Sequence, residues 1–291
     1  MKNSEWLTEA AERLEKVGIE TARLDALVLL CDVTGKSRAH LLAHPELELS
    51  NKQQSALRKL LTRRMEHEPL AYIRGKTEFY GREFYVNYNV LEPRPESETI
   101  ISLLKNLLVD TPTSCAKDGP LRKKVLSEDQ PRTVVDVGTG SGALAITAKL
   151  EWPEVEAVAI DVSPDCLEVA RKNASQHSAD ITFLIGNLLE PITSNPLASP
   201  LIILANLPYV PDDYQINSAA KHEPRLAIFG GKDGLDLYRT MFDQLAEYDS
   251  GEIFVITESL PFQHPELLNI ATTHSYTQIV EKDLIQVFKK Y

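Results

Sequence analysis

The sequence has no long apolar stretch. Its longest unbroken apolar runs contain about six residues, as at 26–31, whereas a helix that crosses a bilayer needs about 20. The N-terminus carries acidic residues early and lacks the apolar segment that is typical of a secretory or transit peptide. We therefore expect a cytoplasmic protein without membrane contact.

Cysteine and basic residues are also scarce. The three cysteines, Cys31, Cys115 and Cys166, are far apart and show no C-x-x-C spacing, so neither a disulfide framework nor a metal site is expected. The 31 Lys and Arg residues are outnumbered by 42 Asp and Glu residues, which gives a net charge of −11. This charge disfavours wrapping of nucleic acid by the whole surface, and no obligatory nucleic-acid partner is expected.

The remaining composition is that of an ordinary globular protein. The 291 residues are 43% hydrophobic and 25% charged, and this length suits one large domain or two smaller ones. Residues 1 to about 70 show helical periodicity, with capping residues at Thr21, Ser37 and Ser50 and with Gly35 as a stop signal. This pattern predicts a small bundle of short helices, which carries no chemistry of its own but can select a partner.

The pattern changes to aromatic and β-branched residues at 72–91, around Gly81, which predicts a β-hairpin that links two domains. Residues 51–82 contain eight Lys or Arg and three Glu, which is a clearly basic stretch in an acidic chain. A solvated helix face is the favoured interpretation of this stretch. A contact patch for an anionic partner is the alternative.

An alternation of strands and helices follows. After a helix at 96–109 and a polar loop or insertion at 110–131, strands are predicted at 133–137, 155–160, 181–185, 201–205, 252–257, 276–281 and 284–289. Helices are predicted at 143–151, 164–176, 234–247 and 263–272. This alternation is typical of an α/β fold with a mainly parallel sheet and helices on both faces. The last two strands should form a hairpin that puts one antiparallel strand into the sheet.

A glycine-rich turn follows the first of these strands. Gly138, Thr139, Gly140, Ser141 and Gly142 form a G-x-G-x-G pattern that runs from a strand into a helix. Glycines in such a turn allow backbone N–H groups at the helix N-terminus to contact a ligand. The spacing differs from the G-x-G-x-x-G of dinucleotide folds, and no Lys-Ser/Thr follows as in a P-loop. The pattern therefore favours S-adenosylmethionine over NAD or ATP.

Two further strand ends supply candidate cofactor contacts. Asp161, with Val162 after it, ends the next strand, where a carboxylate can accept both ribose hydroxyls of a nucleoside. Asn187 and Leu188 follow the third strand, where the Asn side chain can reach an adenine amine. An ordinary turn is the alternative role for Asn187. Together with the glycine turn, these residues predict a nucleoside-containing cofactor.

The strand at 201–205 ends in Asn206-Leu207-Pro208-Tyr209. The Asn206 side-chain oxygen and the Leu207 carbonyl are two acceptors beside the cofactor, and the Tyr209 ring offers a flat face. This arrangement suits methyl transfer to a planar nitrogen, whose N–H groups would donate to both acceptors as positive charge develops. An ordinary proline turn is the alternative. These four residues are the candidate catalytic and substrate-binding residues, and no general base is assigned.

Several motifs resemble those of one family. Residues 206–209 are similar to the N-P-P-Y motif of S-adenosylmethionine-dependent methyltransferases that act on planar nitrogens. Three longer segments closely resemble the release-factor glutamine N5-methyltransferases: residues 68–84, 90–98 and 223–238. The resemblance covers essentially the whole chain.

This resemblance implies methylation of the glutamine side-chain nitrogen (N5) in the Gly-Gly-Gln motif of bacterial peptide-chain release factors. The implied fold is a seven-stranded class I methyltransferase sheet of Rossmann-like type, at 93–291, preceded by a helical substrate-recognition domain at 1–71 and a β-hairpin linker at 72–92. The helical domain would dock the release factor, and Arg94 and Pro95 would line the substrate site. A monomer is expected.

Three positions depart from the family pattern. Leu207 replaces the first Pro, Asn187 stands where Asp is usual, and Glu258-Ser-Leu replaces Glu-x-Gly. Because Asn-Leu-Pro-Tyr is also the form found in rRNA adenine dimethyltransferases, an adenine N6-methyltransferase acting on RNA or DNA is one alternative, against which the net charge argues. A catalytically silent release-factor or ribosome adaptor is another, against which the intact Asn206, Pro208 and Tyr209 argue.

Overall fold

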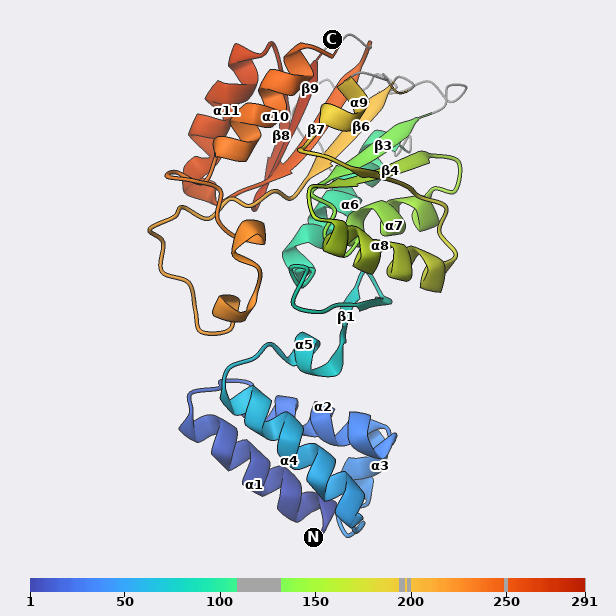
Figure 1. Ribbon diagram of the computed structural model, residues 1–291, viewed down its shortest axis with the longest axis vertical. Coiled ribbons are helices and arrows are strands. Elements are labelled where there is room, and N and C mark those ends of the chain that lie inside the picture. Colours follow the sequence, from blue (N-terminus) through green and yellow to red (C-terminus); the bar gives the residue numbers. More distant parts are fainter. Residues whose placement is uncertain (109–131, 194–196, 198–199, 249–250, 291) are drawn as a thin grey trace, which may run out of the picture. The chain divides into compact units, whose positions relative to one another are not determined.

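The computed structural model describes residues 1–108, 132–193, 197, 200–248 and 251–290 (Figure 1). The predicted loop or insertion at 110–131 lies outside the described residues. The chain divides into two compact units. The first comprises Met1–Lys76 and Ile216–His222, and the second comprises Thr77–Gln215 and Glu223–Tyr291.

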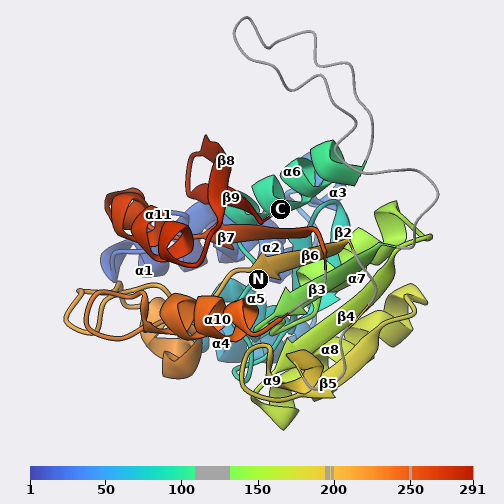
Figure 2. The ribbon, with the colours of Figure 1, turned by 90° about the horizontal axis from the view of Figure 1, so that it is seen from above.

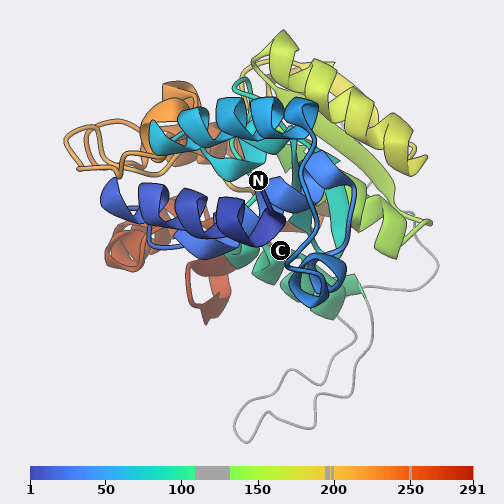
Figure 3. The same ribbon diagram turned by 90° about the horizontal axis from the view of Figure 1, so that it is seen from below.

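The first unit is a helical bundle, as the sequence predicts. Its helices are α1 (Asn3–Lys16), α2 (Ala22–Thr34), α3 (Arg38–Ala43), α4 (Asn51–Met65) and α5 (Leu70–Arg74). The helices α1, α2 and α4 pack against one another (Figure 3) and bury leucines such as Leu14, Leu29 and Leu57. Two predicted caps are confirmed, because the Ser37 and Ser50 hydroxyls accept hydrogen bonds from the N–H groups of His40 and Gln53.

The basic stretch at 51–82 is partly neutralised within the chain. Four of its cations form ion pairs with acidic side chains: Arg63 with Glu68, Arg64 with Asp25, Arg74 with Asp32, and Arg82 with Glu151. These pairs leave the stretch with less free positive charge than its composition suggests. They weigh against a contact patch for an anionic partner.

The linker hairpin is shorter than predicted. It consists of β1 (Lys76–Phe79) and β2 (Arg82–Tyr85), whereas residues 72–74 belong to helix α5, so the strand prediction is wrong there. Gly75, with φ of 70°, ends this helix in the left-handed conformation, which outweighs the β propensity of the residues before it. Tyr80 and Gly81 both have positive φ, as a two-residue hairpin turn of type I′ requires.

The second unit is built on a seven-stranded sheet with the order β5-β4-β3-β6-β7-β9-β8. The strands are β3 (Thr133–Val137), β4 (Glu156–Asp161), β5 (Thr182–Ile185), β6 (Leu201–Ala205), β7 (Ile253–Glu258), β8 (Thr277–Lys282) and β9 (Ile285–Lys290). Strand β9 pairs antiparallel with both β7 and β8, and the other pairings are parallel. The predicted α/β sheet with one antiparallel strand is thereby confirmed.

Helices cover both faces of the sheet (Figure 2). One apolar core joins the sheet to α9 (Glu190–Thr193), α10 (Asp236–Ala246) and α11 (His264–Thr273). The other joins it to α6 (Glu98–Leu108), α7 (Ala143–Glu151) and α8 (Pro164–His177). Short 3₁₀ turns lie at Pro95–Ser97, Ala220–His222, Arg225–Ala227 and Pro261–Gln263. Since β3, β4, β5 and β6 are parallel, the loops after their carboxyl ends lie at one edge of the sheet.

Candidate active site

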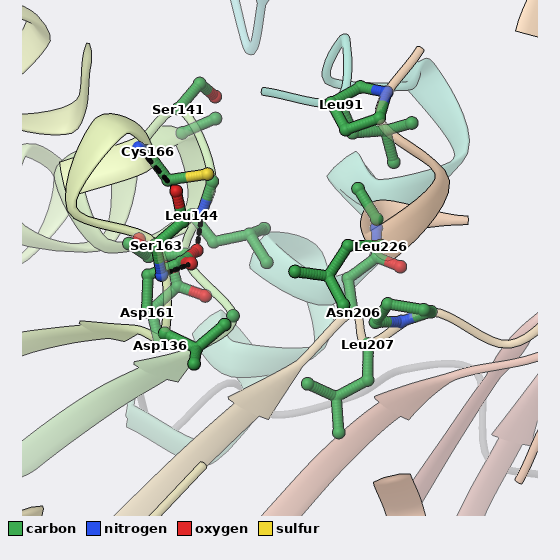
Figure 4. Close-up of a pocket in the computed structure, with 18 of the residues that line it drawn as sticks. Leu91, Asp136, Ser141, Leu144, Asp161, Ser163, Cys166, Asn206, Leu207 and Leu226 are labelled. Carbon is green, nitrogen blue, oxygen red and sulfur yellow. Dashed lines mark hydrogen bonds between the residues drawn. The ribbon is translucent and has the colours of Figure 1, made fainter. Parts of the chain in front are cut away.

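A cavity of about 500 Å³ lies at this edge, within the second unit. Most of the predicted site residues line it: Arg94, Gly138, Thr139, Gly140, Ser141, Asp161, Val162, Asn187, Leu188, Asn206, Leu207 and Pro208. Three predicted residues, Pro95, Gly142 and Tyr209, are not among the lining residues. Figure 4 shows Asp161, Ser163 and Cys166 on one side of the cavity and Asn206, Leu207 and Leu226 on the other.

The glycine turn connects β3 to α7, and four of its residues, Gly138 to Ser141, line the cavity. Gly138, Gly140 and Gly142 have φ values of 70°, 55° and 82°, a region that favours glycine. A Cβ on Gly142 would come within 2.9 Å of Ile146 Cδ1, whereas a Cβ on Gly140 would meet open space. Glycine at 142 is therefore needed both for packing and for its backbone conformation, whereas glycine at 140 is needed for its backbone conformation alone.

Asp136, in strand β3 two residues before the turn, is a lining residue that the sequence reasoning missed. Its Oδ2 accepts hydrogen bonds from the Thr139 hydroxyl (2.6 Å) and from the Ala145 N–H (3.1 Å). Burial raises the pKa of Asp136 to about 6, and these two donors oppose the effect. The carboxyl thus holds the first turn of α7 against the glycine turn. The sequence does contain a signal for this role, because Asp136 is an acidic residue within an otherwise apolar or uncharged strand, two residues before Gly138.

Asp161 ends strand β4 and faces the cavity with a nearly buried carboxylate. Its Oδ2 accepts from the Gly140 N–H (2.9 Å) and its Oδ1 from the Ser163 N–H (2.9 Å), as Figure 4 shows. Burial raises the pKa of Asp161, and these backbone donors oppose the rise. Each carboxylate oxygen can accept more than one hydrogen bond, so the group can also bind two ligand hydroxyls.

The loop after β5 contributes Asn187 and Leu188. The Asn187 side chain is exposed and donates to Glu190 Oε1 (3.3 Å), so it also makes a local turn contact at the start of α9. Leu188 has a φ of 54°, which is uncommon for a residue with a side chain and is often found at functional sites. Both residues line the cavity.

Asn206 and Leu207 follow β6 on the opposite side of the cavity. Asn206 Nδ2 donates to the Ser97 hydroxyl (2.9 Å), so the side-chain oxygen remains as the acceptor. In the described part of the chain, neither this oxygen nor the Leu207 carbonyl has a hydrogen-bond donor. The Leu207 side chain is buried, and its Cδ2 lies 3.1 Å from the position that a Cβ on Gly138 would take. Leucine therefore packs beneath the glycine turn at the position where the family has proline.

The segment at 223–238 holds Pro208 and Tyr209 in place. A Cβ on Gly230 would overlap the Pro208 carbonyl, and a Cβ on Gly234 would overlap the Tyr209 carbonyl. Gln263 Nε2 also donates to the Tyr209 carbonyl (2.7 Å). These contacts give this segment a physical role, because glycine is needed where its backbone meets the loop after β6.

Arg94 lines the cavity but is held by an ion pair. Its Nη2 lies 2.7 Å from both carboxylate oxygens of Glu223, which is nearly buried. Burial raises the pKa of Glu223, and Arg94 opposes this rise. The pair joins two segments of the cavity wall that lie far apart in the sequence, so Arg94 has a structural role in addition to the predicted substrate contact.

Cys166 is another lining residue outside the predicted site. Its thiol donates to the Asn89 carbonyl (3.1 Å), and burial raises its pKa to about 11. A thiol with this pKa is a poor nucleophile at neutral pH, and its hydrogen bond to the Asn89 carbonyl is a structural contact. Among the described residues, no group of three or more His, Cys, Asp or Glu side chains could hold a metal ion. No helix in the described ranges is both long and apolar enough to cross a membrane.

Comparison with known proteins gives consistent matches along the chain. A family model described as the PrmC N-terminal domain matches residues 5–75, and one described as the Methyltransferase small domain matches residues 121–222. A release factor glutamine methyltransferase of Coxiella burnetii is 34% identical over 265 residues, which cover 90% of this chain and 88% of that protein. Another, of Koribacter versatilis, is 34% identical over 82% of this chain and 79% of that protein.

Longer relatives and solved structures are also similar. A bifunctional methyltransferase of Rickettsia felis is 34% identical over 96% of this chain, but the match covers 55% of that protein. The chain thus spans about half the length of the bifunctional Rickettsia relatives. The crystal structure of the hMettl16 catalytic domain in complex with MAT2A 3'UTR hairpin 6 has a TM-score of 0.50 at 12% identity, over 84% of this chain and 83% of that chain. This likeness concerns the fold.

Proposed function

Because this chain belongs to the release factor glutamine methyltransferase family and has the class I methyltransferase fold, we propose that it methylates peptide-chain release factors. The methyl group of S-adenosylmethionine would pass to the side-chain amide nitrogen of the glutamine in their Gly-Gly-Gln motif. The observation that carries the proposal is the orientation of Asn206. Its oxygen and the Leu207 carbonyl are two acceptors on the side of the cavity opposite Asp161.

The cavity fits the proposed cofactor. A volume of about 500 Å³ lies within the range of roughly 300–1,000 Å³ that is usual for small-molecule sites. Asp161 would bind the ribose hydroxyls, the turn at 138–142 would hold the methionine end, and Asn187 with Leu188 would contact adenine. S-adenosylmethionine would supply an electrophilic methyl group on a positively charged sulfur.

The chain's own residues would act on the glutamine amide. Its nitrogen is a poor nucleophile because its lone pair is delocalised into the carbonyl. Donation of its two N–H groups to Asn206 Oδ1 and to the Leu207 carbonyl favours the partly positive nitrogen that develops as the N–C bond forms. Tyr209 would hold the plane of the amide. After transfer, the nitrogen loses a proton to water, so no side chain is required as a base.

The helical unit supports a protein substrate. Residues 5–75 match the PrmC N-terminal domain, and this match ends close to the boundary of the first unit at Lys76. We infer that this unit docks the release factor and that the second unit carries the chemistry. We propose the division at 1–71, 72–92 and 93–291 that the sequence predicts, in which the hairpin links recognition to catalysis.

Mass spectrometry tests the proposal. The protein is incubated with labelled S-adenosylmethionine and with a release factor or an adenine-containing oligonucleotide, and the products are digested and sequenced. We expect one added methyl group on the glutamine of the Gly-Gly-Gln peptide. Adenine methylation with none on glutamine would replace the proposal with the adenine alternative, and absence of any transfer would favour the silent adaptor.

Asn206→Ala isolates the proposed acceptor. It should lower turnover by roughly 100-fold or more while S-adenosylhomocysteine still binds, because the lost interaction forms as charge develops on nitrogen. Asn269→Ala, on the exposed side of α11, is the matched control and should retain the activity of the unmutated protein.

A further inference from the structure

Gln263 is a buried side-chain amide that the proposed mechanism does not use. It ends the 3₁₀ turn Pro261–Gln263 between β7 and α11, and its exposed fraction is 3%. Its Oε1 accepts from the Leu260 N–H (2.8 Å), and its backbone N–H donates to the Leu260 carbonyl (2.8 Å). These two bonds fix the side chain at the start of α11 and leave both Nε2 hydrogens for partners outside the turn.

Both of these hydrogens reach backbone carbonyls of other segments. Nε2 donates to the Tyr209 carbonyl (2.7 Å) and to the Asp233 carbonyl (2.7 Å). In the described part of the chain, no backbone N–H donates to the Tyr209 carbonyl, so Gln263 is the group that satisfies it. A glutamate of the same shape would place an oxygen against both carbonyls, so this position requires an amide.

Gly234 makes room for the Gln263 amide. A Cβ on Gly234 would overlap both the Tyr209 carbonyl and Gln263 Nε2. Asp233, the residue before it, is itself held, because its carboxylate accepts a hydrogen bond from Arg239 of helix α10 (2.9 Å). The amide therefore connects Tyr209 to a segment that is anchored to α10.

The Tyr209 carbonyl is two residues from the Leu207 carbonyl, one of the two proposed acceptors. Pro208 lies between them, and its ring fixes one of the few backbone torsions that separate the two carbonyls. We propose that Gln263 is a positioning residue, which holds the Tyr209 carbonyl and thereby aims the Leu207 carbonyl and the Tyr209 ring at the glutamine amide. The inference rests on the proposed function. The other end of Tyr209 is held separately, because its hydroxyl donates to Glu258 Oε1 (3.1 Å).

The test is Gln263→Met, which keeps the length of the side chain and removes the two donors. With saturating S-adenosylmethionine and a release factor as substrate, kcat should fall on the order of 10–100-fold, because a small displacement of the groups that orient a substrate slows its reaction by about this factor. The KM for the release factor and the affinity for S-adenosylhomocysteine should each stay within about threefold, because no docking or cofactor contact is changed. A merely structural role would lower the free energy of unfolding and leave the kcat of the folded protein unchanged.

Gln286→Met is the matched control. It makes the same substitution at a buried glutamine of β9, whose Nε2 donates to the His264 carbonyl (3.3 Å) and to Gln278 Oε1 (3.2 Å). Among the described residues, the Gln286 side chain makes no hydrogen bond to the loop after β6, so this variant should retain the kcat of the unmutated protein. Gln263→Asn is a second variant, which keeps the amide but is one methylene too short to reach both carbonyls, and it should show the same loss of kcat.

The outcomes separate this inference from the proposed function. If the unmutated protein methylates glutamine but the Gln263 variants retain its kcat, or change only KM, the inference alone is overturned. An equal loss of kcat in Gln286→Met, or a failure of both Gln263 variants to fold, would assign Gln263 a structural role and would also overturn it. If the unmutated protein does not methylate glutamine, the proposed function fails and this inference fails with it.

Discussion

Asp136 and Asp161 are carboxyl groups that the fold keeps from water at the edge of the cavity. Burial raises the pKa of both, and hydrogen bonds from neighbouring backbone and side-chain donors offset part of the penalty. Burying a carboxyl group costs stability to the extent that these hydrogen bonds do not replace its lost hydration. The position of both groups at the cavity agrees with ligand binding at this edge, and their raised pKa values make both stability and affinity depend on pH.

The pH dependence of stability follows from Asp136. Its pKa is about 6 in the folded protein and about 4 when unfolded, so the folded state binds the proton more tightly. The free energy of unfolding should therefore decrease by about 3 kcal/mol as the pH rises from about 4 to above 6. Asp136→Asn should lack this component. Urea unfolding without cofactor, at several pH values, measures the difference between the two proteins, and a difference that does not change with pH would contradict the assignment.

Asp161→Ala tests the proposed ribose contact. The substitution should weaken S-adenosylhomocysteine binding by roughly 1.5–3 kcal/mol, the range for hydrogen bonds to a charged group. Since the carboxylate is the acceptor and its pKa is raised, affinity for the unmutated protein should also fall as the pH decreases through that pKa. Calorimetry measures both effects. Unchanged affinity in a folded variant would remove Asp161 from the site.

Gly142 and Gly140 provide a matched comparison within one turn. Alanine at either position must adopt a positive φ, but only at Gly142 does the new Cβ meet Ile146 and Ala170. Gly142→Ala should therefore lower the free energy of unfolding by roughly 1–3 kcal/mol more than Gly140→Ala does. Chemical unfolding of both variants decides the point, and equal losses would show that backbone conformation alone determines the choice of glycine.

At the scale of elements, helix α8 joins the hairpin to the glycine turn through one buried side chain. Asn173 Nδ2 donates to the carbonyls of Tyr85 and Ser141 (2.9 Å each), and its Oδ1 accepts from the Tyr85 N–H (2.8 Å). The amide thus pairs with both backbone hydrogen-bonding groups of Tyr85 at the end of β2, as a residue of a neighbouring strand would. It connects the linker directly to the wall of the cavity.

Asn173→Ala should be strongly destabilising. It leaves three backbone groups without their partner in a buried place, so we expect a loss of about 2–4 kcal/mol. Gln176→Ala is the control one turn further along α8, where the exposed side chain makes a hydrogen bond to the Glu83 carbonyl, and should cost less than about 1 kcal/mol. Urea unfolding and hydrogen exchange at the Tyr85 amide measure the two effects. Similar losses in both variants would contradict the role of Asn173 as a connector.

At the scale of the whole molecule, the division into two units separates proposed recognition from proposed chemistry. The cavity is lined entirely by residues of the second unit, whereas the PrmC N-terminal match lies in the first. Segment Ile216–His222 nevertheless belongs to the first unit, although it follows β6 in the sequence. The first unit therefore includes a segment that comes after β6 in the sequence.

The fragment 77–291 tests this separation. It should bind S-adenosylhomocysteine and methylate a short Gly-Gly-Gln peptide, because it contains the complete cavity wall. It should lose most methylation of an intact release factor, because the proposed docking unit is missing. The measurement is the methylation rate of the fragment on the peptide and on the intact release factor, with the full chain as the control. Full activity of the fragment on the intact factor would remove the recognition role from the bundle.

The sequence by itself determined most elements of the fold. The bounds predicted for β3, α7 and β6 agree with the structure, because short buried apolar runs and glycine turns impose their conformation locally. The positions of the glycine turn, Asp161 and Asn206 were also predictable, since each lies at or directly after the carboxyl end of a parallel strand and therefore at the same sheet edge. The helices α5 and α9 were missed, because such short segments carry too few residues for a periodic signal.

The tertiary structure alone decided which side chains meet. The pairing of Arg94 with Glu223 and the hydrogen bond of Asn206 to Ser97 join residues more than 100 positions apart, and no local pattern encodes such partners. The hydrogen bond from the Tyr209 hydroxyl to Glu258 likewise depends on the register of β6 against β7. Local sequence sets backbone conformation through sterics and burial, whereas contacts between distant segments follow from strand order and packing, which the whole chain determines together.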